Sequence, residues 1–240
     1  MWYSQGEVGR ARTALTRGLA LAHGAGDDME MVAQAENLFG HMEHAVGNLN
    51  AARDRFTRSI EGFRALAIPW GTGNALIGMA GVALATGDAG QAERLLDEAT
   101  SVLRHAGPWF LNLPLYIRAI LAVRRGNADD AIALVRESLI RSLELHDKFA
   151  FVYALVPLAT AAVLKGEDAW AARILGARDA VTERTGATAA DKSGHDLRER
   201  AEREGRTRLG PDGWARAYAA GRKTSLDSLL KDIDRVVGKG

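Results

Sequence analysis

The stretch Gly87-Asp88-Ala89-Gly90-Gln91-Ala92-Glu93-Arg94-Leu95-Leu96 contains the pattern that decides the fold. A glycine is followed by an acidic or amide residue, by alanine five places on, and by a large apolar residue nine places on. The pattern recurs at nearly constant intervals along the chain, and its glycines are Gly6, Gly47, Gly87, Gly126 and Gly166. A regular period of this kind indicates an array of stacked units.

Between these glycines the apolar residues follow helical spacing. From Ala75 to Leu84 they recur three and four apart, which is typical of an amphipathic helix facing a core. Glycine ends such a helix easily because it adopts the left-handed backbone conformation. The residue after it can cap the next helix by accepting a free backbone N–H group. The capping residues predicted in this way are Glu7, Asn48, Asp88, Asn127 and Glu167.

Small residues stand where two helices must approach closely. Seven places before the glycines are Gly40, Ala80, Ala119 and Ala159, and nine places after them are Leu15, Phe56, Leu96, Val135 and Leu175. This alternation resembles the tetratricopeptide repeat, although the period exceeds the usual ~34 residues and that repeat's leading aromatic and closing proline are missing. The predicted helix pairs are 28–46 with 49–66, 72–86 with 89–106, 109–125 with 128–145, and 148–165 with 168–185.

The sequence therefore predicts an all-α fold. We expect a right-handed α-solenoid of about four and a half tetratricopeptide-like helix pairs over residues 1–186, closed by a C-terminal helical cap over residues 187–240. Pro69, Pro108 and Gly26-Asp27 are predicted to mark joints between pairs. Pro157 is expected to kink its helix.

The first unit lacks most of its leading helix. Val8 to His23 is predicted to be a second helix without its partner, so we expect the chain to be a fragment of a longer protein. The incomplete edge, with Trp2 and Tyr3 at its centre, is a candidate surface for self-association.

In the predicted cap, a loop over 187–195 precedes a charged helix from Asp196 to Leu209. A turn over 210–213 and a helix through Trp214 follow, and Ser225 is predicted to cap a last helix. The signs of charge alternate between Arg198 and Arg208, which favours an exposed helix with internal ion pairs.

Several phrases, in order along residues 28–233, resemble the C-terminal helical-repeat region of large ATP-dependent bacterial regulators of the LuxR type and of related cyclases. They are Pro69-Trp70-Gly71-Thr72, the stretch from Gly87 to Ala99, Ala171-Ala172-Arg173-Ile174-Leu175-Gly176-Ala177, and the run from Leu209 through Trp214 and Tyr218 to Leu226. The resemblance implies a sensor or interaction arm, which an ATPase module precedes and, in some members, a DNA-binding module follows.

Composition favours a soluble, cytoplasmic protein. Hydrophobic residues make up 47% and charged residues 25% of the chain, and the net charge of +1 gives no general attraction to nucleic acid. The absence of cysteine removes disulfides and thiolate chemistry and fits a reducing compartment. No apolar stretch approaches the ~20 residues of a membrane span.

Few residues suggest chemistry. The turns at Gly71-Thr72-Gly73 and Gly221-Arg222-Lys223 lack the spacing of a phosphate-binding loop. His41 and His44 stand three apart on one predicted helix and could face one metal ion, but the sequence shows no third ligand. We therefore interpret them as polar lining and predict no catalytic residue, metal or cofactor.

The candidate binding surface is the concave face, which the first helix of each pair would line. The residues at its inward positions are Gln34, Asn37, His41, His44, Asn74, Ile77, Leu113, Tyr116, Ile120, Tyr153, Val156 and Thr160. We expect a non-catalytic regulatory module that binds a protein, a peptide or a small effector there. The alternatives are a free-standing scaffold protein and a non-catalytic fragment of a cyclase or ATPase. No contact with nucleic acid or membrane is expected.

Overall fold

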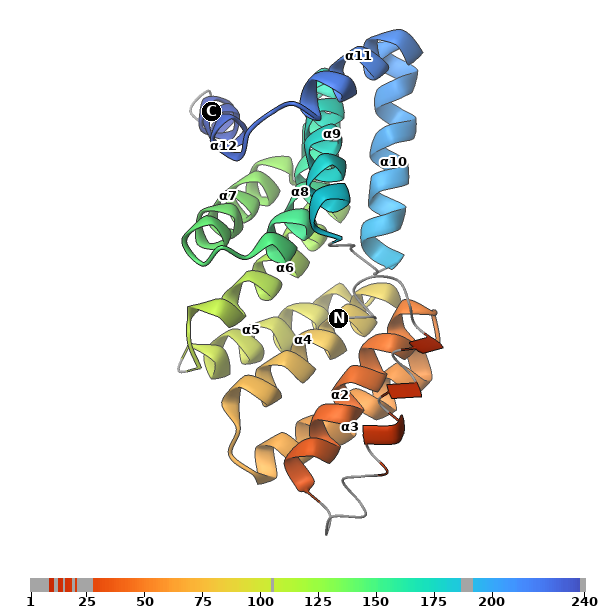
Figure 1. Ribbon diagram of the computed structural model, residues 1–240, viewed down its shortest axis with the longest axis vertical. Coiled ribbons are helices and arrows are strands. Elements are labelled where there is room, and N and C mark those ends of the chain that lie inside the picture. The colour runs from red at the N-terminus through yellow and green to blue at the C-terminus, as the bar shows by residue number, and fades with distance from the viewer. Residues whose placement is uncertain are drawn as a thin grey trace. The chain divides into compact units, whose positions relative to one another are not determined.

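The computed structural model describes residues 9–10, 13–14, 16–18, 20, 28–104, 106–186 and 192–237. Their regular structure is entirely helical, which confirms the all-α class (Figure 1). The elements are α2 (Met29–Ala45), α3 (Leu49–Ala65), α4 (Pro69–Ala85), α5 (Ala89–Leu103), the 3-10 helix η2 (Pro108–Leu111), α6 (Asn112–Arg124), α7 (Ala128–Glu144), α8 (Lys148–Leu164), α9 (Asp168–Thr185), α10 (Lys192–Leu209), α11 (Pro211–Gly221) and α12 (Leu226–Val237).

The chain divides into two compact units. The first comprises residues 1–114 with 190–192, and the second comprises residues 115–189 with 193–240. In the first, α3 packs on α2 and on α4, and α4 packs on α5. In the second, α8 packs on α7 and α9, while α11 packs on α9 and α12 on α7. The predicted boundary at 186/187 adjoins residues outside the described ranges and stays a prediction.

Most helices of the array end next to a residue with a positive φ angle. Such residues recur regularly, at Gly47, Ala67, Gly87, Gly107, Gly126, His146, Gly166 and Gly186, although Gly107 stands beyond the end of α5 and directly before η2. Several of the turns also share a hydrogen-bond pattern: Asn48 N–H donates to the carbonyl of Glu43, and Ile68 N–H donates to that of Phe63. Such six-to-one bonds satisfy the last carbonyl groups of a helix. Residues with positive φ therefore recur at half the interval of the glycine pattern in the sequence. Two of these turns were not predicted, because Ala67 and His146 occupy them instead of glycine.

The predicted caps form at only some of the joints. The side chain of Asp88 accepts from Gln91 N–H at 2.8 Å, and that of Asn127 accepts from Asp130 N–H at 3.3 Å. Asn48 and Glu167 make no such bond, so the prediction was wrong for them. The amide of Asn48 instead donates to the carboxylate of Glu43 at 2.7 Å.

A large residue fills the gap that small residues leave between the first three described helices of the array. Phe56 of α3 is fully buried, with Gly40 of α2 on one side and Gly78 of α4 on the other. A Cβ atom built on Gly40 or Gly78 would stand 2.7 or 2.2 Å from the Phe56 ring. The equivalent pairs are also at most 1% exposed: Ala80 with Leu96, Ala119 with Val135, and Ala159 with Leu175.

The C-terminal helices differ from the prediction at two places. Residues 192–195, expected in a loop, belong to α10, and the expected turn at 211–213 is the first turn of α11. Pro211 stands at the start of α11, where its missing N–H costs nothing. Ser225 does cap α12, since its hydroxyl accepts from Ser228 N–H at 3.3 Å.

Other predictions meet the limits of the described residues. The described ranges exclude several predicted features: Trp2, Tyr3, Glu7, Leu15, the joint at Gly26-Asp27 and much of the predicted helix from Val8 to His23.

Pro157, which was expected to kink its helix, lies inside α8, and the helix continues through it. In the described part of the chain no helix is both long and apolar enough to cross a membrane.

Candidate functional site

Three polar candidates of the first unit, His41, His44 and Asn74, lie between α2 and α4. His41 Nε2 and Asn74 Oδ1 are 3.4 Å apart, and the His41 ring meets the edge of Phe56 with centroids 4.9 Å apart. The His44 ring lies beside Gly81, 3.4 Å from where a Cβ atom there would stand. The face therefore joins the first helices of two consecutive pairs.

Gln34 and Asn37 both stand on α2 but in different surroundings. Gln34 is exposed, whereas Asn37 is 3% exposed and its carbonyl oxygen Oδ1 has no hydrogen-bond partner. A buried acceptor without a partner costs about 1–3 kcal/mol, so such a group needs an explanation.

The environment keeps His41 neutral at physiological pH. Burial of the ring lowers the pKa of His41 from 6.5 to about 4, the hydrogen bond to Asn74 partly opposes this, and the charge of His44 adds to it. A neutral imidazole has one N–H donor and one acceptor nitrogen.

The candidates of the second unit are mostly buried. Tyr116 of α6 is 4% exposed and forms an edge contact with the half-buried Tyr153 of α8, with centroids 5.2 Å apart. Thr160 is 1% exposed and donates to the carbonyl of Val156 at 3.1 Å and weakly to that of Leu197, in α10, at 3.5 Å. Ile120 and Val156, like Ile77 of the first unit, are buried as well.

A polar junction that the sequence did not suggest joins α9, α10 and α11. Asp179 accepts two hydrogen bonds from Arg198, at 2.6 and 2.5 Å, one from Tyr218 at 2.6 Å, and one from Arg178 at 2.8 Å. Farther along, Arg208 donates to Asp168 at 2.8 and 2.6 Å.

The charged helix α10 is therefore only partly as expected. Ion pairs within it do form, with Arg200 and Glu204 at 2.7 Å and Arg206 and Glu202 at 2.6 Å. The expectation that the whole run from Arg198 to Arg208 is solvated was wrong, because both terminal arginines bind carboxylates of α9.

Arginine side chains decide the protonation state of this junction. Burial alone would raise the pKa of Asp179, but hydrogen bonds from Arg198 and Tyr218 and the charges of Arg198 and Arg178 hold it below its usual value. Burial and the bond to Asp179 raise the pKa of Tyr218. Asp179 is thus an ionised carboxylate and Tyr218 a neutral phenol, and their hydrogen bonds hold α9, α10 and α11 together. One signal for this junction was present in the sequence. Asp168 and Asp179 are separated by about as many residues as Arg198 and Arg208, so two antiparallel helices can pair both carboxylates with both arginines.

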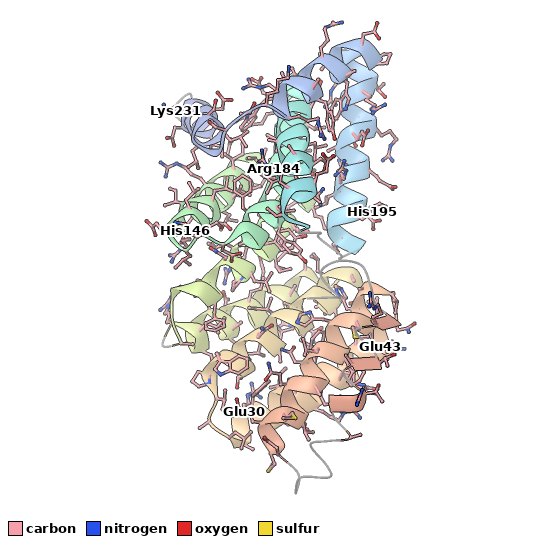
Figure 2. All side chains as sticks on the ribbon, in the orientation of Figure 1. Glu30, Glu43, His146, Arg184, His195 and Lys231 are labelled. Carbon is pink, nitrogen blue, oxygen red and sulfur yellow. The ribbon has the colours of Figure 1, made fainter. Side chains whose placement is uncertain are left out.

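Among the described residues, no three His, Cys, Asp or Glu side chains converge in a cluster that could hold a metal ion. Figure 2 shows the side chains of all elements, with His146 and His195 among the labelled residues, and His195 pairs with Glu199 on the surface of α10 at 3.1 Å. No protein-family model matches the chain, and no curated protein is significantly similar to it.

Proposed function

We propose that this chain is a non-catalytic regulatory module that binds a protein partner or small effector along the first helices of its pairs. The observation that carries the proposal is the repeated joint, with a left-handed φ at Gly47, Gly87, Gly126 and Gly166 and the same buried small and large residues around each. A unit repeated in this way supports a tetratricopeptide-like right-handed solenoid, a fold whose extended concave surface serves binding.

The resemblance of the phrases around Trp70, Leu96, Ala171 and Trp214 to LuxR-type regulators supports a place within an ATP-dependent bacterial transcriptional regulator. The module would act in the cytoplasm, receive a signal through its binding face and relay it to an ATPase module. The chemistry of the polar face fits this role, because amides and a neutral imidazole suit reversible recognition by hydrogen bonds.

Site-specific photocrosslinking in the native host would test the binding face. A photoreactive amino acid at exposed Gln34, on α2, should crosslink one defined partner, whereas the same amino acid at exposed Arg53, on α3, should not. Equal crosslinking from both positions, or none from Gln34, would contradict the proposal. Small effectors would be detected as ligands that protect the Gln34 position from crosslinking.

Two further measurements separate the alternatives. The reading frame immediately upstream of Met1 should encode an ATPase module, and an unrelated frame would favour the free-standing scaffold. The purified chain should not hydrolyse ATP or form cyclic nucleotides; turnover that follows the chain through purification would overturn the non-catalytic assignment.

A further inference from the structure

Helix α12 packs on α7 with one side and exposes the other. Leu229 and Ile233, four residues apart on the covered side, are 1% and 0% exposed, whereas Lys231 is exposed. Residues four apart share one side of a helix, and the residue halfway between them faces away. Helix α12 is therefore amphipathic, and its apolar side covers part of α7 (Figure 1).

Acidic residues flank this apolar pair and bind arginines of two other helices. Arg173 of α9 donates to Asp232 at 2.9 Å, and Arg136 of α7 donates to Asp234 at 2.6 Å. Successive residues are rotated by about 100° around a helix, so the two aspartates lie on opposite sides of Ile233. The helix thus presents an apolar stripe with a carboxylate on each side.

The surface beneath α12 has the complementary pattern. Ile132 and Leu139 stand four residues before and three residues after Arg136, so they share its side of α7, and both are at most 1% exposed. Arg173 adds a second cation from α9. These four residues define the α7–α9 surface. An apolar centre with cations beside it fits an amphipathic helix that carries acidic residues beside its apolar stripe.

The rest of the second unit is fastened independently of α12. The contacts that hold α10 and α11 on α9, such as the pair of Asp179 and Arg198, do not involve α12. Arg136 and Asp234 add little to stability, because their side chains are 42% and 54% exposed. Ser225 caps α12 from the link before it, so the cap moves with the helix. Helix α12 is therefore a separately attached piece of the unit.

We propose that the α7–α9 surface is a docking site for an acidic amphipathic helix of a protein partner, and that α12 occupies it until this helix displaces it. The partner helix would carry two apolar residues four apart, with a carboxylate on either side of the second, as Leu229, Asp232, Ile233 and Asp234 do in α12. Because α12 is tethered, its effective concentration is roughly millimolar, so a partner must match this pattern to compete. The surface lies on the second helices of their pairs, so the proposal does not rest on the binding face proposed above.

Fluorescence anisotropy with a labelled peptide of residues 224–240, the sequence of α12, tests this site. In the full chain, Leu229→Asp with Ile233→Asp should undock α12, and this opened variant should bind the peptide at least about tenfold more tightly than the unaltered chain. Lys231→Asp is the matched control, because it adds a carboxylate to the exposed side of α12. Its peptide binding should equal that of the unaltered chain.

Charge reversals in the opened variant locate the bound peptide. Arg173→Glu should weaken peptide binding at least about tenfold, because it would set a carboxylate against the nearly buried Asp232 of the peptide. Arg141→Glu makes the same change on another side of α7 and should alter affinity much less. A peptide with Asp232→Lys should bind the Arg173→Glu chain more tightly than the unaltered peptide does.

Hydrogen exchange of the unaltered chain keeps the test decisive if the opened variant fails to fold. A roughly millimolar excess of the peptide, marked by Lys231→Arg so that its mass differs, should speed exchange in the chain's own α12 at least about tenfold. A peptide with Asp232→Lys and Asp234→Lys should leave exchange unchanged.

Four results would overturn the proposal. They are no binding to a folded opened variant, equal binding by the opened and unaltered chains, unchanged exchange with excess peptide, and a dimer of the unaltered chain that Arg173→Glu separates. In the last case the α12 of a second copy would be the occupant of the surface.

Discussion

Single glycines determine how closely the helices of the first unit approach. Gly78 stands in the middle of α4, where glycine normally costs about 0.5–1 kcal/mol relative to alanine. The Phe56 ring occupies the space that a side chain at Gly78 would need. The structure therefore loses helix propensity at this position and gains the burial of a complete aromatic ring.

Gly78→Ala should lower the free energy of unfolding by about 1–3 kcal/mol, because its methyl group would meet the Phe56 ring and force it to move. Gly90→Ala, in the exposed first turn of α5, is the matched control. Its methyl group would lie 3.5 Å from the flexible Arg94, so we expect no loss and a gain of up to ~1 kcal/mol. Urea unfolding measures both changes, and equal stabilities of the two variants would contradict the packing of Phe56.

His41 should make stability depend on pH. Its pKa is 6.5 in an unfolded chain and about 4 in the folded protein, so between these values the unfolded chain binds a proton that the folded chain does not. Stability is therefore lost as pH falls from about 6.5 to about 4. The shift corresponds to at most ~3 kcal/mol; because the residue as a whole keeps some exposed surface, we expect about 1–2 kcal/mol.

Urea unfolding of the unaltered chain and of His41→Gln at pH 7, 5.5 and 4.5 measures this term. The difference between the two proteins should shrink toward low pH, because glutamine does not titrate. His195→Gln, at an exposed site, should keep the pH dependence of the unaltered chain. Parallel curves for the unaltered chain and His41→Gln would show that the imidazole is not desolvated.

At the scale of elements, α9 carries the contacts that fasten the last helices. Its backbone approaches that of α11 so closely that a Cβ atom on Gly176 would stand 2.1 Å from the carbonyl oxygen of Tyr218. Its carboxylates Asp168 and Asp179 bind Arg208 and Arg198 of α10, and Glu183 binds Arg222, which follows α11. Close backbone packing against α11 and ion pairs with α10 and Arg222 thus both involve α9.

Gly221→Ala should detach α11 from α9. The new methyl group would stand 2.0 Å from the carbonyl oxygen of Arg173, and backbone atoms cannot turn aside as a side chain can. We expect a loss of about 2–3 kcal/mol and faster hydrogen exchange in α11. Gly213→Ala, in the same helix, faces only the side chain of Leu209 and should leave exchange nearly unchanged. Equal exchange in both variants would contradict the close contact.

At the scale of the molecule, the sequence predicted local features better than partners. The helix ends and left-handed joints at Gly47, Gly87, Gly126 and Gly166 were predictable because they follow from the backbone freedom of glycine and from apolar spacing nearby. The joints at Ala67 and His146 were missed, because neither residue type marks a positive φ. The candidate polar face was predictable only as a set of positions on separate helices.

The sequence by itself determined the all-α class, most of the helix ends and many of the buried residues, since these depend on local periodicity. Tertiary structure decided that His41 meets Asn74, that Asn37 is left without a partner for its carbonyl oxygen, and that Arg198 reaches Asp179. The physical reason is that such contacts depend on helix crossing and side-chain reach, which local periodicity does not encode.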